Sequence, residues 1–148
     1  LCQIAAKEIP KAEASDLEQR LGGINYTIRT VLAVKEQYPD QNLFLIVGGD
    51  MLLCFHRWKE YQAILENVTL LAGARTQTQR RELEAYCRKV LPQYSQIHLV
   101  DFSPVEISST ALREMAARGE EIGPWVPKGV AKYIQRHGVY QRKEEAKS

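Results

Sequence analysis

Short runs of apolar residues alternate with amphipathic stretches along most of the chain. The clearest apolar run covers residues 43–47, and further runs follow at residues 68–72 and 97–100. Runs of this length favour strands, and a continuously apolar one favours a strand buried on both faces of a parallel sheet. Polar alternation predicts another strand within residues 12–17.

Helical patterns occupy the segments between the strands. Thr27 is a good N-cap for a helix that continues to about Gln37. The apolar side of this helix is formed by Ile28, Val31, Leu32 and Val34. The other expected helices cover residues 1–9, 50–55, 58–65, 78–90 and 109–117, and a last helix begins at Pro127 and ends at His137-Gly138. Strands that alternate with helices predict an α/β fold with a parallel sheet.

Composition narrows the class of protein. The 148 residues carry a net charge of +2, which gives no reason to expect a nucleic acid or a membrane as partner. No apolar run approaches the roughly 20 residues that span a bilayer. Cys2, Cys54 and Cys87 are widely spaced, which favours free thiols in a cytoplasmic protein and no metal site. We expect one domain over residues 1–140 and a charged tail over residues 141–148.

Gly48-Gly49-Asp50 follows the clearest predicted strand directly. Ligands of open parallel sheets bind outside the carboxyl ends of the strands. Glycine lets a ligand approach the backbone closely, and a carboxylate can accept two hydrogen bonds from a diol such as a ribose. The alternative is a plain turn in which Asp50 caps the next helix.

A second group of polar residues stands at a later helix start. Three hydroxyl residues, Ser108, Ser109 and Thr110, precede Arg113 by about one turn. A helix N-terminus attracts phosphate, and a guanidinium on the same face can bind its oxygens. The alternative is an ordinary capped helix in which Arg113 pairs with Glu114 or Glu120.

Two weaker candidates remain. Trp58 could stack on a flat cationic ring, although a tryptophan is more often part of the core. Tyr26 and Thr27 stand at a helix start whose N–H groups could bind a carboxylate, but helix starts of this kind are common.

Taken in order, these elements resemble bacterial nicotinate-nucleotide adenylyltransferases of the nucleotidylyltransferase superfamily. The resemblance covers about residues 14–140 and is carried by Asn25-Tyr26-Thr27, Gly48-Gly49-Asp50 with Trp58, Ile107-Ser108-Ser109-Thr110 with Arg113, and Val126-Pro127, Tyr133-Ile134 and His137-Gly138-Val139-Tyr140. It implies a Rossmann-like parallel sheet flanked by helices.

The resemblance also implies a reaction. Nicotinate mononucleotide and ATP with Mg²⁺ would give nicotinate adenine dinucleotide and pyrophosphate. Tyr26, Thr27 and Trp58 would hold the nicotinate, and Gly48 and Asp50 the ribose of ATP. The remaining implied ATP contacts are Ile107, Ser108, Ser109, Thr110 and Arg113, of which Ser109, Thr110 and Arg113 would act on the phosphates in catalysis.

The chain departs from the family pattern in three places. Nothing matches the family's Gly-x-Phe-Asp-Pro-x-His-x-Gly-His loop, so we expect the first strand, this loop and the first helix to lie upstream of Leu1. Groups of this kind contribute about 10²–10³ each in rate, so the chain as written is expected to be nearly inactive. Arg75-Thr76-Gln77 replaces a frequent Arg-Pro-Gly, which leaves Arg75 either at the site or on the surface, and Gly49 replaces a frequent Ala.

Three other functions stay open at this point. They are an adenylyltransferase for nicotinamide mononucleotide, a non-catalytic nucleotide-binding fragment, and an α/β interaction module with chance matches. A sheet without its first strand would also leave an unpaired edge and invite homo-oligomer formation.

Overall fold

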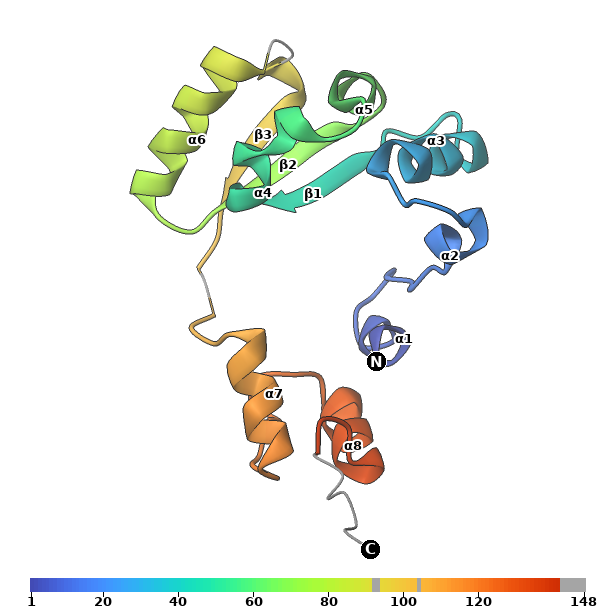
Figure 1. The fold of residues 1–148 in the computed structure, drawn as a ribbon, viewed down its shortest axis with the longest axis vertical. Coiled ribbons are helices and arrows are strands. Elements are labelled where there is room, and N and C mark those ends of the chain that lie inside the picture. The colour runs from blue at the N-terminus through green and yellow to red at the C-terminus, as the bar shows by residue number, and fades with distance from the viewer. Residues whose placement is uncertain (92–93, 104, 142–148) are drawn as a thin grey trace, which may run out of the picture. The chain divides into compact units, whose positions relative to one another are not determined.

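A computed structural model describes residues 1–91, 94–103 and 105–141 (Figure 1). It divides into two compact units. We call Asp16–Pro104 the sheet unit, and Leu1–Ser15 together with Val105–Ser148 the helical unit. All but the first residue of the expected tail at residues 141–148 lie outside the described residues.

The described part of the sheet unit contains three parallel strands. They are β1 (Phe44–Gly48), β2 (Thr69–Ala74) and β3 (Ile97–Asp101), in the order β1-β2-β3. All three apolar runs therefore form strands, as predicted, and the helices between them provide the crossovers that parallel pairing needs. The parallel sheet with its flanking helices agrees with the Rossmann-like architecture that was expected.

The helices of the sheet unit follow the sequence patterns with a few shifts. They are α2 (Leu17–Leu21), α3 (Thr27–Gln37), α4 (Gly49–Leu53), α5 (Tyr61–Asn67) and α6 (Gln77–Val90), with short 3₁₀ turns η1 (Phe55–Arg57) and η2 (Tyr94–Gln96). The helix predicted from Trp58 begins only at Tyr61, because Glu60 before it adopts a left-handed backbone conformation with φ of 52°.

The strand predicted within residues 12–17 is wrong. Residues 12–16 have no regular structure, and Leu17 begins α2. The segment contains small and acidic residues and no β-branched or aromatic one, so it lacks the side chains that favour a strand.

The core of the sheet unit lies between the helices and one face of the sheet. The largest fully buried side chains are Phe55, Leu52, Ile64, Leu65, Leu70, Leu83, Leu91 and Cys87. On the other face, Phe44 and Ile46 are 60% and 77% exposed. Successive side chains of a strand point to opposite faces, so the prediction that this strand is buried on both faces is wrong for the described residues. Leu32, expected on the apolar side of α3, is also exposed.

The helical unit consists of α1 (Cys2–Ala6), α7 (Ser109–Ala117) and α8 (Lys128–His137) around a small core. The first turn of α8 is capped from far along the chain, because the Gly129 N–H donates to Glu8 Oε1 at 2.8 Å. At its other end, Gly138 takes a left-handed conformation, as the sequence predicts for a helix C-cap. None of the helices in the described part of the chain is long and apolar enough to cross a bilayer.

Candidate functional site

The turn after β1 places an exposed carboxylate over a glycine. Gly48 is extended and forms the N-cap of α4, and Asp50 lies in the first turn of that helix. A Cβ atom on Gly48 would lie 2.7 Å from Asp50 Oδ1, so the carboxylate is folded back towards this backbone. The N-cap of α4 is Gly48 and not Asp50. The arrangement leaves the carboxylate oxygens available to a diol.

Gly49 is more constrained than its neighbour. A Cβ atom there would lie 2.9 Å from the carbonyl oxygen of Gly73 and 3.0 Å from Leu83. This glycine therefore allows α4 to pack closely against β2, and its replacement of a frequent Ala is a larger change than the sequence suggested.

The first turn of α3 is open. Tyr26 is the N-cap, with an extended backbone, and Thr27 is the first helical residue rather than the N-cap that was predicted. The side chain of Tyr26 makes no capping hydrogen bond to this helix end. An uncapped first turn presents N–H groups with a partial positive charge, which can receive a carboxylate.

A single guanidinium holds the loop that precedes this turn. Arg29 Nη1 donates to the carbonyl oxygens of Gly22 and Ile24 at 2.7 and 2.9 Å. Its Nη2 atom donates to the carbonyl of Leu21 at 3.0 Å. Arg29 thereby fixes the path of the chain into α3.

Trp58 lies at the border of the core. Its side chain is half-buried, and its ring centroid lies 4.9 Å from that of the fully buried Phe55. Trp58 and Thr27 line the same hollow, of about 320 Å³, between α3 and β1. Two of the three residues predicted to hold the nicotinate therefore face one cavity.

The start of α7 carries the predicted phosphate-binding residues in the helical unit. Ser108 is the N-cap, and its hydroxyl accepts the N–H of Ala111 at 3.0 Å. Arg113 Nη2 donates to Thr110 Oγ1 at 3.2 Å, so these side chains share a face of α7, as predicted. Ser109 is exposed and Ile107 half-buried.

Arg113 forms no ion pair within the described residues. Glu120, one of its two suggested partners, pairs instead with Arg118 at 2.6 Å. The hydrogen bond from Arg118 holds the pKa of the Glu120 carboxyl below its ordinary value. Because Glu120 is already paired, Arg113 keeps its positive charge available at the start of α7.

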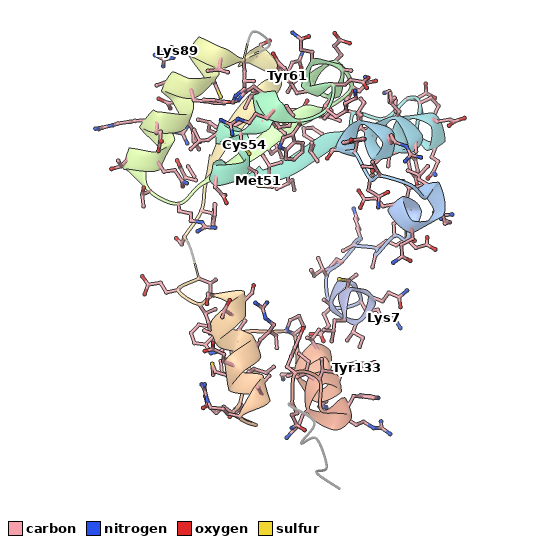
Figure 2. The ribbon with its side chains drawn as sticks, in the orientation of Figure 1. Lys7, Met51, Cys54, Tyr61, Lys89 and Tyr133 are labelled. Carbon is pink, nitrogen blue, oxygen red and sulfur yellow. The ribbon has the colours of Figure 1, made fainter. Side chains whose placement is uncertain are left out.

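Sequence reasoning missed one pair in the sheet unit. The imidazole Nδ1 of His56 lies 2.5 Å from the hydroxyl oxygen of Tyr86. Figure 2 labels Cys54 and Tyr61, which flank the segment that contains His56 and Trp58. The position of Tyr86, three residues after the buried Leu83 on the inner side of α6, is the signal that could have indicated this contact.

Arg75 lies on the surface but beside a hollow. It is exposed and lines a cavity of about 380 Å³ together with Thr76, Asp101 and Phe102, at the carboxyl ends of β2 and β3. The sequence left open whether Arg75 lies at the site or on the surface, and its location is compatible with both.

The amino-acid sequence is similar to a known family and to named proteins of two bacteria. A family model described as cytidylyltransferase-like matches residues 4–115. The probable nicotinate-nucleotide adenylyltransferase of Flavobacterium johnsoniae is 33% identical over 139 residues, which cover 94% of this chain and 69% of that protein. The probable nicotinate-nucleotide adenylyltransferase of Thermotoga maritima is 36% identical over 125 residues, which cover 84% of this chain and 60% of that protein.

Solved structures agree with the fold. The nicotinic acid mononucleotide adenylyltransferase of Plasmodium falciparum complexed with APC superimposes with a TM-score of 0.64 at 18% identity, covering 89% of this chain and 66% of that one. The same enzyme complexed with NaAD gives a TM-score of 0.57 at 15% identity, covering 79% of this chain and 58% of that one. Such low identity establishes the fold alone, and this chain spans less than two thirds of the length of either structure.

The assignment to a family rests on sequence. The cytidylyltransferase-like model covers most of the chain, and the Flavobacterium protein exceeds 30% identity over nearly all of it. The chain therefore belongs to the nicotinate-nucleotide adenylyltransferases, within the cytidylyltransferase-like family.

Proposed function

We propose that this chain serves adenylyl transfer from ATP to nicotinate mononucleotide, which yields nicotinate adenine dinucleotide and pyrophosphate in NAD biosynthesis. The observation that carries the proposal is the hollow shared by Thr27 and Trp58 beside the open first turn of α3. A carboxylate on an aromatic cation needs both features, an anion-binding helix end and an aromatic surface.

The nicotinate end is assigned to the sheet unit. The N–H groups at Tyr26 and Thr27 bind the carboxylate, and Trp58 stacks on the pyridinium ring. The support is the uncapped start of α3 and the half-buried position of Trp58. A neutral amide would gain less from the helix dipole, so nicotinate is favoured over nicotinamide.

The ATP contacts come from two helix starts. Gly48 and Asp50 hold the ribose through close backbone approach and carboxylate hydrogen bonds. Ser108, Ser109 and Thr110, which follow Ile107, bind the phosphates with Arg113. Two observations support this assignment: these polar side chains are exposed, and Arg113 forms no ion pair with any described residue.

The chemistry is an in-line displacement. A phosphate oxygen of nicotinate mononucleotide attacks the α-phosphorus of ATP and forms the new P–O bond, while the bond from that phosphorus to the bridging oxygen breaks and pyrophosphate leaves with the electron pair. No covalent enzyme intermediate is needed. The protein aligns the two phosphates and stabilises the negative charge that develops on them, the role we assign to Arg113, Ser109 and Thr110.

Mg²⁺ enters this proposal as part of the substrate. The described residues contain no group of three or more His, Cys, Asp or Glu that could hold a metal ion. Mg²⁺ commonly binds through substrate phosphates and keeps several waters, so we assign it to ATP. We place the protein in the cytoplasm because Cys2, Cys54 and Cys87 are free thiols.

Calorimetric titration of the full chain with nicotinate mononucleotide and with ATP tests the proposal. Trp58→Ala should abolish binding of the mononucleotide and leave ATP binding unchanged. Trp125→Ala, which removes an exposed tryptophan of the helical unit, is the matched control and should change neither. Failure of both ligands to bind the unmodified chain would contradict the proposal.

The phosphate role is tested in the same titration. Arg113→Ala should weaken ATP binding by about tenfold or more, because hydrogen bonds to charged groups contribute about 1.5–3 kcal/mol. Arg118→Ala removes an arginine of the same segment that is already paired with Glu120, and ATP should bind this control as it binds the unmodified chain. Equal losses in the two variants would refute the role of Arg113.

Comparing nicotinate with nicotinamide mononucleotide settles the acceptor. We expect the nicotinate compound to bind more tightly to the unmodified chain. Tighter binding of the nicotinamide compound would assign the chain to the related reaction instead.

A further inference from the structure

The segment that carries Trp58 is short and irregular. It follows α4 as the 3₁₀ turn η1, in which the Arg57 N–H donates to the Cys54 carbonyl and the Trp58 N–H to the Phe55 carbonyl, both at 2.9 Å. A turn of three residues makes few hydrogen bonds of its own. The orientation of Trp58 therefore depends on what anchors this turn to the rest of the sheet unit.

One anchor is aromatic. Phe55 is completely buried, and its ring contacts those of Trp58 and Tyr61 at centroid distances of 4.9 and 6.3 Å. This cluster supports the indole from the core side. It fixes where the ring rests but makes no directional hydrogen bond to the turn.

The second anchor is polar and comes from α6. The Tyr86 hydroxyl lies 2.5 Å from His56 Nδ1 and 3.5 Å from the His56 backbone N–H. The two rings lie 5.8 Å apart. Tyr86 is carried by a fourteen-residue helix that is fixed in the core through Leu83 and Cys87, so the hydroxyl offers a rigid point of attachment.

The Tyr86 hydroxyl contacts both the backbone and the ring of His56. Burial raises the pKa of the Tyr86 hydroxyl, so it remains a neutral O–H group at neutral pH. The hydroxyl oxygen accepts the His56 backbone N–H, and it shares a second hydrogen bond with Nδ1 whose donor is set by the His56 tautomer. His56 is thus held at both its backbone and its ring, two residues before Trp58.

We propose that His56 and Tyr86 are positioning residues for the nicotinate ring, because their hydrogen bond fixes the turn that orients Trp58. The inference rests on the proposed stacking role of Trp58. A ring that is held in place before binding loses less conformational freedom when the ligand arrives, so the pair should contribute to affinity for the mononucleotide and not for ATP.

Tyr86→Phe is the direct test, since it removes the hydroxyl and keeps the ring. We expect the dissociation constant for nicotinate mononucleotide to rise about three- to tenfold, as the loss of one hydrogen bond implies, while that for ATP stays unchanged. Tyr133→Phe, at an exposed tyrosine of α8, is the matched control and should bind both ligands normally.

A spectroscopic readout follows Trp58 without any ligand. In a Trp125→Phe background Trp58 is the sole tryptophan of the chain. Tyr86→Phe should then lower the fluorescence anisotropy of Trp58, and His56→Asn should do the same. The double variant should resemble each single one, because both changes remove the same interaction.

The outcomes separate this inference from the proposed function. If the unmodified chain does not bind the mononucleotide, or Trp58→Ala binds it normally, the proposed function fails and the inference fails with it. If the unmodified chain binds but Tyr86→Phe and His56→Asn retain both its affinity and its Trp58 anisotropy, only the inference is overturned. Lower unfolding stability with unchanged anisotropy would likewise reduce the pair to a structural role.

Discussion

The guanidinium of Arg29 shows how one side chain can shape a binding site without touching the ligand. It holds the segment before α3 at three points, the carbonyls of Leu21, Gly22 and Ile24. Gly22 has a positive φ of 57°, so this loop takes a path that its backbone does not favour for most residues. Arg29 stabilises that path and with it the open first turn of α3.

Replacing Arg29 by Met should loosen this loop. The variant keeps a long apolar stem but cannot donate to the three carbonyls, and we expect a loss of about 1–3 kcal/mol in the free energy of unfolding, measured with urea. Binding of nicotinate mononucleotide should weaken and binding of ATP should not.

Arg20→Met is the control for that change. Among the described residues, the ion-pair partner of Arg20 is the exposed Asp16, and such a surface pair contributes at most about 1 kcal/mol. If Arg20→Met and Arg29→Met lower stability and mononucleotide binding equally, Arg29 does not organise the loop.

The buried thiol of Cys87 should lower the free energy of unfolding as the pH becomes alkaline. Burial raises the pKa of this thiol to about 11, above its value in the unfolded chain, so folding favours the protonated form. The resulting stability is fully present below the ordinary thiol pKa of about 8.5 and is lost as the pH rises towards about 11. Urea midpoints between these pH values should fall more steeply for the unmodified chain than for Cys87→Ala. Parallel curves for the two proteins would contradict the assignment.

At the scale of elements, the junction of β1 and α4 depends on Gly49. Its missing side chain lets α4 approach the Gly73 carbonyl, which a Cβ atom would meet at 2.9 Å. We expect Gly49→Ala to cost about 1–3 kcal/mol in the free energy of unfolding, as overpacking usually does.

Gly48→Ala is the matched control, because a Cβ atom there meets only the flexible carboxylate of Asp50. Its stability should change little, whereas ATP binding should weaken if the ribose approaches this backbone. A chain in which Gly49→Ala is as stable as Gly48→Ala would show that α4 can shift freely on β2.

The elements themselves could be predicted because their signals are local. Apolar runs gave all three strands, and α7 has the predicted bounds. The wrong predictions of burial concern packing between elements. Other elements decide whether Phe44, Ile46 and Leu32 are covered, and the pattern within one strand or helix does not contain that information. The strand predicted at residues 12–16 was wrong for a local reason, because the alternating residues there are not ones that favour strands.

For the whole molecule, the sequence placed most candidate site residues on the correct elements, although Trp58 precedes α5 instead of beginning it. It did not predict the contacts that support these residues. Gly48, Asp50 and Ser108 stand at helix starts and Arg113 lies one turn into α7, as expected. The contacts that hold such residues join positions far apart in the chain, such as His56 with Tyr86. Spacing along the sequence predicts neighbours on one helix face and not partners across the fold.

The whole molecule is expected to associate with copies of itself. β1 is an outer strand of the described sheet, and it exposes Phe44 and Ile46 on the face opposite the core. Outer strands with exposed apolar residues tend to associate unless a charge prevents it. We therefore expect sedimentation velocity to show concentration-dependent oligomers of the unmodified chain.

Ile46→Lys should suppress this association, because it places a charge on the exposed face of β1. The urea midpoint should remain within error of the unmodified protein, since exposed substitutions usually change stability by less than about 0.5 kcal/mol. Leu32→Lys adds the same charge at an exposed position of α3 and should leave association unchanged, which distinguishes an effect of the strand from one of net charge. A clean monomer of the unmodified chain at its highest attainable concentration would contradict the prediction, because the exposed face of β1 would then lack the self-affinity on which it depends.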